Sequence, residues 1–219
     1  MMTALLPLGD QAALAYFDDE TSALHFAARL RAARLPWCID VVQAYTSVAV
    51  FFDLNQVNFD AVAPRLRRLG EEAAVPPTAR KLHRIPCCYE LQLDLDRVAR
   101  HTGLAPDEVV RRHAAAEYTV YAIGFCPGFP YLGYLPPELS GVPRLPSPRL
   151  RVEAGSVGLT GRQTGIYTEA RPGGWNLIGR TPLQLVDVAD GYFPLRTGDR
   201  VRFERIDEAE FHRLQGQRL

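Results

Sequence analysis

The chain predicts an α+β domain followed by a mainly β domain. Over roughly the first 88 residues, strand-like runs alternate with segments that have apolar residues at helical spacing. From Arg149 onward, short apolar runs are separated by glycine-bearing turns with no helical pattern between them. Many short strands without intervening helices are typical of a barrel or a sandwich. We therefore expect an N-terminal α+β domain at 1–88, then a short helical connector and a β domain at 89–219.

The N-terminal elements follow from local periodicity. We expect strands at 11–17, 37–42, 46–52 and 82–89, with a first helix at 22–34. A second helix presents Phe59, Val62, Leu66 and Leu69 on one face. Its Pro64 is tolerated if Asp60 caps the helix, because amides of the first turn have no partner within the helix. The order of these elements indicates an α+β sandwich. Val75, Pro76 and Pro77 mark a hinge or a sheet edge.

Two short helices are expected in the connector. Asp94 can cap the first, at 95–101, and Gly103 ends it. The second begins at Pro106 and ends near His113, immediately before a strand at 118–125. There the helix dipole would favour a charged histidine, although His113 is also a candidate for a pocket or partner surface. The β region is expected to contain strands at 152–159, 166–168, 175–178, 183–187 and 200–204.

The stretch 124–135 is the most distinctive part of the sequence. Prolines fix φ and glycines permit dihedrals closed to other residues, so neither helix nor strand is expected to continue through it. This loop is either a packed connector or a surface that binds a ligand or partner, since rigid aromatic loops are common at binding sites. The surface candidates, besides His113, are Phe125, Pro127, Gly128, Phe129, Pro130 and Tyr131.

Four ordered motifs carry a resemblance to a known family: Gly-Phe-x-Pro-Gly-Phe-Pro-Tyr-Leu-Gly, Ala-Gly-Ser-Val-Gly, Gln-Thr-Gly-Ile-Tyr and Gly-Gly-Trp-x-Leu-Ile-Gly. They resemble the family of the 5-oxoprolinase B subunit, allophanate hydrolase subunit 1 and a sporulation-kinase inhibitor. The resemblance implies a ferredoxin-like N-terminal domain and a cyclophilin-like β-barrel. It also implies a complex with the C and A subunits of 5-oxoprolinase that hydrolyses 5-oxo-L-proline to L-glutamate with ATP and Mg, at a nucleotide site shared with a partner.

Opening a lactam ring requires cations for anionic groups, donors for a developing oxyanion and an apolar wall against bulk water. The second half of the chain concentrates residues of these kinds. The substrate- or nucleotide-binding candidates are Arg149, Ser156, Gln163, Thr164, Tyr167, Gly173, Gly174 and Trp175. Taken singly, each also has a structural interpretation, such as a turn glycine, a core tryptophan or a surface ion pair. No catalytic residue is assigned.

Several common catalytic motifs are absent. The sequence lacks a Gly-x-Ser-x-Gly elbow and a Walker-type phosphate loop, and its one lysine is Lys81. The four cysteines and five histidines show no metal-ligand spacing, so no metal site is expected. These absences predict that the chain alone has no complete ATP site and is inactive without its partners.

Charge and hydropathy give no indication of a nucleic-acid-binding or membrane-spanning protein. Lys and Arg total 25, as do Asp and Glu, so no basic excess indicates nucleic acid or an anionic membrane. No apolar run approaches the length of a membrane span, and the N-terminus lacks a charged leader. We expect a cytoplasmic protein.

Two alternative functions stay open at this point. One is a binding module without catalysis that inhibits a histidine kinase, for which an aromatic, proline-rich surface would be suitable. The other is a subunit related to allophanate hydrolase or urea carboxylase. That role would require another chain, because no biotin-acceptor Met-Lys-Met is present.

Overall fold

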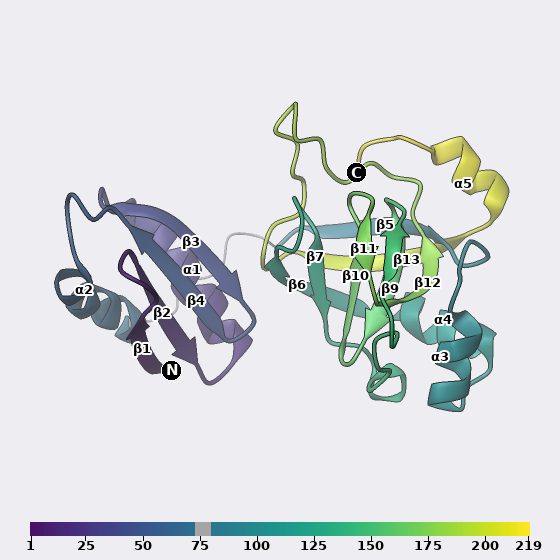
Figure 1. The fold of residues 1–219 in the computed structure, drawn as a ribbon, viewed down its shortest axis with the longest axis horizontal. Helices are drawn as coiled ribbons and strands as arrows, with labels where there is room; N and C mark the ends of the chain where they lie inside the picture. Colours follow the sequence, from purple (N-terminus) through teal and green to yellow (C-terminus); the bar gives the residue numbers. More distant parts are fainter. Residues whose placement is uncertain (73–79) are drawn as a thin grey trace. The chain divides into compact units, whose positions relative to one another are not determined.

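The computed structural model describes residues 1–72 and 80–219. It divides into two compact units, Met1–Arg80 and Lys81–Leu219, and each is described by itself (Figure 1). The hinge expected at Val75, Pro76 and Pro77 lies outside the described residues.

The first unit has a four-stranded antiparallel sheet in the order β1-β2-β4-β3, with two helices. Its elements are β1 (Met2–Pro7), β2 (Ala12–Phe17), α1 (Glu20–Ala33), β3 (Cys38–Ala44), β4 (Ser47–Phe52) and α2 (Phe59–Glu71). Buried Phe26, Phe52 and Leu66 fill the space between helices and sheet. The ferredoxin-like assignment of this unit stays a prediction. Strand β1 was not expected from the sequence, and its residues are only partly buried.

The helix caps differ in part from expectation. Asp19 accepts a hydrogen bond from the Ser22 amide at 2.8 Å and caps α1. Asn58, not Asp60, caps α2 by accepting from the Ala61 amide at 3.0 Å. Because α2 begins at Phe59, Pro64 lies inside the helix, beyond the first turn in which it was expected. The extended backbone of Asn58 is the conformation that an N-cap requires.

The second unit is a closed barrel of seven strands. Its strands follow the order β6-β13-β5-β12-β9-β10-β7, and β7 pairs back onto β6. The barrel strands are β5 (Leu82–Cys88), β6 (Glu117–Ile123), β7 (Pro130–Gly133), β9 (Ser156–Thr160), β10 (Gln163–Ile166), β12 (Asn176–Arg180) and β13 (Arg200–Ile206). Because β13 and β5 run parallel and the other pairs antiparallel, the barrel is mixed. The mainly β prediction is confirmed, and the narrower cyclophilin-like assignment stays a prediction.

Strand β5 belongs to the barrel and not to the first unit. Every residue of Leu82–Cys88 has a register partner on β13. A boundary at residue 88 therefore assigned this strand to the wrong unit. The error has a physical cause: the alternation of apolar residues indicates a strand, but it does not indicate which distant strand will pair with it.

The remaining elements lie around the barrel (Figure 1). They are α3 (Leu95–Thr102), α4 (Pro106–Ala115), a 3₁₀ turn (Pro137–Leu139), the ribbon strands β8 (Arg149–Val152) and β11 (Arg171–Gly173), and α5 (Glu208–Leu214). The strand expected at 152–159 is interrupted by a turn in which Gly155 has φ +83°. Residues 183–187 form no regular strand, and β7 lies within the loop where none was expected.

Candidate functional site

Five aromatic side chains from three segments of the chain meet on the second unit. We call Phe125, Phe129, Tyr131, Tyr167 and Trp175 the aromatic cluster. Phe129 is at its centre, with ring centroids 4.9 Å from Tyr131, 5.3 Å from Tyr167 and 5.5 Å from Trp175. All three contacts are edge-on, the arrangement that aromatic quadrupoles favour. The structure thus brings together three candidates from the 124–135 stretch and two from the later motifs.

Glycines allow the backbone to approach these rings closely. A Cβ on Gly165, in β10, would lie 3.0 Å from both Phe129 Cζ and Trp175 Cζ3. A Cβ on Gly173, in β11, would lie 2.2 Å from the Tyr167 hydroxyl oxygen. Gly174 differs, because the nearest atoms to its Cβ would be 3.8 Å away. Gly173 is therefore required by packing, and Gly174 is not.

Phe125 has an unusual backbone for an exposed aromatic residue. Its φ is +68°, and the Cys126 amide donates to the Gly124 carbonyl at 2.8 Å across it, as in a γ-turn. A bulky residue rarely has positive φ, and such strain is concentrated at functional sites. The side chain is 60% exposed, whereas Phe129 beside it is buried. The loop therefore exposes the Phe125 ring to solvent and buries the Phe129 ring.

Arg149 lies next to this cluster, at the start of β8 and opposite Gly173 in the ribbon. Its Nη2 donates to Asp94 Oδ1 at 2.7 Å, and Asp94 Oδ2 accepts from the Leu177 amide at 2.8 Å. Its other terminal nitrogen, Nη1, is buried and has no hydrogen-bond partner among residues 1–72 and 80–219. A buried donor left unpaired costs about 1–3 kcal/mol, so Nη1 is suited to binding an oxyanion.

Asp94 has a different role from the one expected. Its side chain makes no capping hydrogen bond to α3. Gln92 Oε1 accepts from the Leu95 amide at 2.8 Å instead. Asp94 is buried and orients Arg149, so it belongs to the site, although its place in the sequence indicated only a helix end. No feature of the neighbouring sequence distinguished a helix-capping aspartate from one that pairs with Arg149.

Arg144 is a second residue of the site that was not expected from the sequence. Burial raises the pKa of the Tyr131 hydroxyl, and the nearby Arg144 charge opposes that rise. Burial likewise raises the pKa of Tyr167. A hydrogen bond from the Trp175 amide and the charges of Arg144 and Arg149 lower that pKa in part. Both tyrosines are therefore neutral donors near pH 7, beside two guanidinium groups.

His113 and Thr164 lie inside the barrel and not at this site. His113 is completely buried, with Nδ1 2.8 Å from the Tyr89 hydroxyl and Nε2 2.9 Å from Thr164 Oγ1. Thr164 in turn donates to the Gly158 carbonyl at 3.0 Å. Burial lowers the pKa of His113 to about 3, so the ring is neutral. The expectation of a dipole-stabilised charged histidine is wrong, and His113 lines no open surface, because desolvation outweighs the helix dipole.

The remaining candidates are distributed over neighbouring turns. Ser156 is buried at the start of β9, where its carbonyl accepts from the Tyr167 amide at 2.9 Å. Gln163 begins β10 and is half-buried. In the aromatic loop, the Pro127 carbonyl accepts from Thr168 Oγ1 at 2.7 Å, Pro130 begins β7, and Gly128 has φ +69°. The aromatic cluster, Gly173 and Arg149 form one contiguous arrangement.

The fit of ATP and Mg to this arrangement is limited. Arg149 Nη1 fits one oxyanion, and Arg144 adds positive charge beside it. Within 1–72 and 80–219, no group of three or more His, Cys, Asp or Glu side chains is placed to hold a metal ion. The residues around Arg149 therefore fit an anionic group of a substrate or nucleotide.

Comparison with known proteins identifies the family. The family model described as the carboxyltransferase domain, subdomains C and D, matches residues 3–193. The chain belongs to this family. The 5-oxoprolinase B subunit of Bacillus subtilis is 39% identical over 94% of this chain and 93% of its own length, and that of Escherichia coli O157:H7 is 44% identical over 79% and 80%. The resemblance inferred from the four motifs is confirmed.

A solved structure is similar to this chain in fold and sequence. The crystal structure of TTHA0988 has a TM-score of 0.78 and 35% identity over 90% of this chain. This chain spans only 40% of that longer protein. Among the helices that the structure describes, none has both the length and the apolar character needed to cross a membrane.

Proposed function

We propose that this chain is the B subunit of an ATP-dependent 5-oxoprolinase complex that hydrolyses 5-oxo-L-proline to L-glutamate together with the C and A subunits. The main support is identity of 39% and 44% to two proteins named as 5-oxoprolinase B subunits, the first over almost the whole chain. The arrangement around Arg149 is chemically suitable, because it combines a buried, unpaired donor with an aromatic wall.

In this proposal, Arg149 Nη1 binds the substrate carboxylate or another anionic oxygen. Asp94 holds the guanidinium in place through Nη2, so the planar fork is oriented before the ligand arrives. The aromatic cluster excludes bulk water and thereby strengthens this charge interaction. ATP bound in the complex would supply the phosphoryl group that activates the lactam carbonyl. Its site is shared with a partner protein, and the complex is cytoplasmic.

The test is reconstitution. The chain is purified alone and together with the A and C subunits from the same genome, and glutamate and ADP formed from 5-oxoproline are measured. We expect turnover only from the mixture of all three proteins. Turnover by the single chain would contradict the shared site, and a fully assembled complex without activity would contradict the substrate assignment.

A second candidate is a non-catalytic inhibitor of a histidine kinase. The observation that favours it is Phe125, which is 60% exposed on a strained turn and so is available to a protein partner. Titration against a purified kinase distinguishes the two proposals. Inhibition of autophosphorylation at stoichiometric concentrations, without binding to the 5-oxoprolinase C subunit, would favour the inhibitor.

The carboxyltransferase description of the family model keeps one further alternative open, an allophanate hydrolase or urea carboxylase-related subunit. Supplying urea-derived substrates to the same reconstituted mixture tests it directly. Turnover of those substrates in preference to 5-oxoproline would support it.

A further inference from the structure

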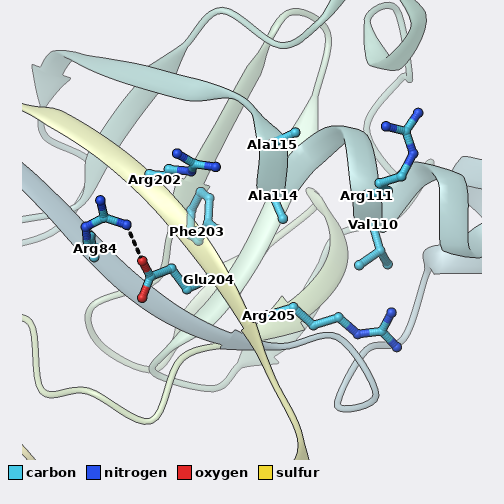
Figure 2. Close-up of a pocket in the computed structure, with 9 residues that line it drawn as sticks. All are labelled: Arg84, Val110, Arg111, Ala114, Ala115, Arg202, Phe203, Glu204 and Arg205. Atoms are coloured by element: carbon cyan, nitrogen blue, oxygen red, sulfur yellow. Dashed lines mark hydrogen bonds and ion pairs between the residues drawn. The ribbon is translucent and has the colours of Figure 1, made fainter.

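A separate pocket of about 440 Å³ lies on the second unit, lined by residues of α4, β13 and β5 (Figure 2). Its lining includes none of the aromatic cluster. Val110, Ala114, Ala115 and Phe203 form an apolar part. The charged residues that line it are Arg84, Arg111, Arg202, Arg205 and Glu204. Its volume falls in the range of small-molecule sites, and its lining carries four guanidinium groups against one carboxylate.

Two of these arginines are direct neighbours. Arg202 and Arg84 occupy paired register positions on the parallel strands β13 and β5, and neighbouring strands are about 4.8 Å apart. Both project from the outward face, since the alternating residues Val201 and Phe203 are buried. Like charges at paired positions destabilise a sheet unless an anion lies between them.

The nearby carboxylates do not neutralise the excess positive charge of the pocket. Glu204 pairs with Arg84 at 2.6 Å (Figure 2). Glu117, the register partner of Arg202 on the other side, pairs with Arg200 instead. Within the part of the chain that the structure describes, Arg202 has no ion-pair partner. One guanidinium is therefore left free at the side of the pocket.

The other two arginines are already neutralised. Arg111 makes two hydrogen bonds to Glu108, at 2.6 and 2.7 Å, and Arg205 pairs with Glu90 at 2.8 Å and lies 3.7 Å from Asp107. In Figure 2 both side chains extend away from the Arg84–Glu204 pair. The pocket therefore requires about one unit of negative charge next to Arg202, together with an apolar group against Val110 and Ala114.

We propose that this pocket binds a small organic anion, in which a carboxylate or phosphate pairs with Arg202 and a compact apolar body lies against α4 and Phe203. The guanidinium fork matches either oxyanion. This site goes beyond the proposed 5-oxoprolinase function and does not depend on it.

The test is an NMR titration of the full chain that follows the arginine Nε–Hε signals. Benzoate and adenosine monophosphate are the two organic probes, and inorganic phosphate is the probe without an apolar body. The Arg202 signal is assigned from its loss in Arg202→Gln. We expect saturable displacement of that signal by at least one organic probe, with half-saturation about tenfold or more below that of phosphate, which corresponds to about 1.4 kcal/mol. The probe that binds identifies the oxyanion.

Two variants and a matched control complete the test. Arg202→Gln should abolish binding, followed through the remaining arginine signals, and Ala114→Leu should block the organic probe while it leaves the charges unchanged. Arg151→Gln, which removes an exposed arginine on β8 outside the pocket lining, should bind like the wild type. The proposal is overturned if neither organic probe saturates, if phosphate binds as well as both, or if Arg202→Gln binds normally.

Discussion

Arg149 and Asp94 form an ion pair in which each partner has a second role. Asp94 Oδ1 accepts from Arg149 Nη2 at 2.7 Å, while its other oxygen accepts from the Leu177 amide at 2.8 Å. Arg149 Nη1 is buried and has no partner within the described part of the chain. The pair therefore attaches β8 to the beginning of α3 and of β12 and leaves one oriented donor for a ligand.

Replacing Arg149 should separate these two roles. Arg149→Lys retains a cation for Asp94 but loses the fork, so we expect the reconstituted complex to lose about tenfold or more of its activity, equivalent to about 1.4 kcal/mol of transition-state binding. Arg149→Ala should also lower the free energy of unfolding by about 1–3 kcal/mol, because it leaves the Asp94 carboxylate buried without its cation. Steady-state kinetics and urea unfolding measure the two effects.

The control for Arg149 is Arg151→Lys, on the same strand. Arg151 pairs with Glu153 and is mostly exposed, so neither kinetics nor stability should change by more than about a few tenths of a kcal/mol. Wild-type kinetics for Arg149→Lys in an assembled complex would exclude Arg149 from the binding site.

Alanine substitutions at the adjacent glycines should differ sharply. A Cβ on Gly173 would meet the Tyr167 hydroxyl oxygen at 2.2 Å, so Gly173→Ala should displace Tyr167 and cost about 1–3 kcal/mol of stability. Gly174→Ala, with its nearest contacts at 3.8 Å, should be close to neutral. Thermal melting of the two variants in parallel measures the difference, and equal melting temperatures would contradict the packing role of Gly173.

Trp175 is buried against Phe129, with 5% of its surface exposed. We expect Trp175→Ala to cost about 3–5 kcal/mol, typical of removing a large core side chain. Melting measured beside complex activity separates folding from function. A folded, stable Trp175→Ala protein that is inactive in the complex would show that the indole acts at the site and not in the core.

His113 should make stability depend on pH. Its pKa is lowered to about 3 in the folded protein, against an ordinary value of about 6.5. Between these values the unfolded state binds the proton and the folded state does not, so stability falls as pH decreases from about 6.5 toward 3. The contribution reaches about 1.4 kcal/mol per pH unit.

A substitution isolates this histidine from other titrating groups. His113→Gln can still accept from Tyr89 and donate to Thr164, yet it does not titrate. Its free energy of unfolding should therefore depend less steeply on pH below about 6.5 than that of the wild type. His101→Gln, the same replacement at an exposed position, is the matched control. Identical slopes for wild type and His113→Gln would refute the buried neutral ring.

Phe125 should matter for assembly more than for folding. Phe125→Gly removes an exposed ring and relieves a positive φ that glycine adopts freely, so stability should be unchanged or slightly higher. If the loop contacts a partner protein, size-exclusion chromatography of the reconstituted mixture should show reduced complex formation. Normal assembly of Phe125→Gly would remove this ring from the partner surface.

The sequence by itself determined the features that depend on neighbouring residues. Helical spacing predicted α1, and the start signal at Pro106 predicted α4, both close to their observed positions. Glycine-bearing turns between short apolar runs predicted the mainly β second unit. Four motifs were sufficient to identify the family. The clustering of functional candidates was anticipated in part, since Phe129, Tyr167 and Trp175 do meet.

Only the tertiary structure decided which distant groups pair and which are excluded from water. It assigned β5 to the barrel through β13, gave Arg149 its partner Asp94, and buried His113 deeply enough to keep it neutral. It also placed Arg84 and Arg202 side by side at one pocket. An alternating apolar pattern is compatible with many strand partners. The sequence around a charged residue likewise does not show whether its side chain is exposed to water or buried. Both are set by long-range packing, which selects one register and one dielectric environment for each group.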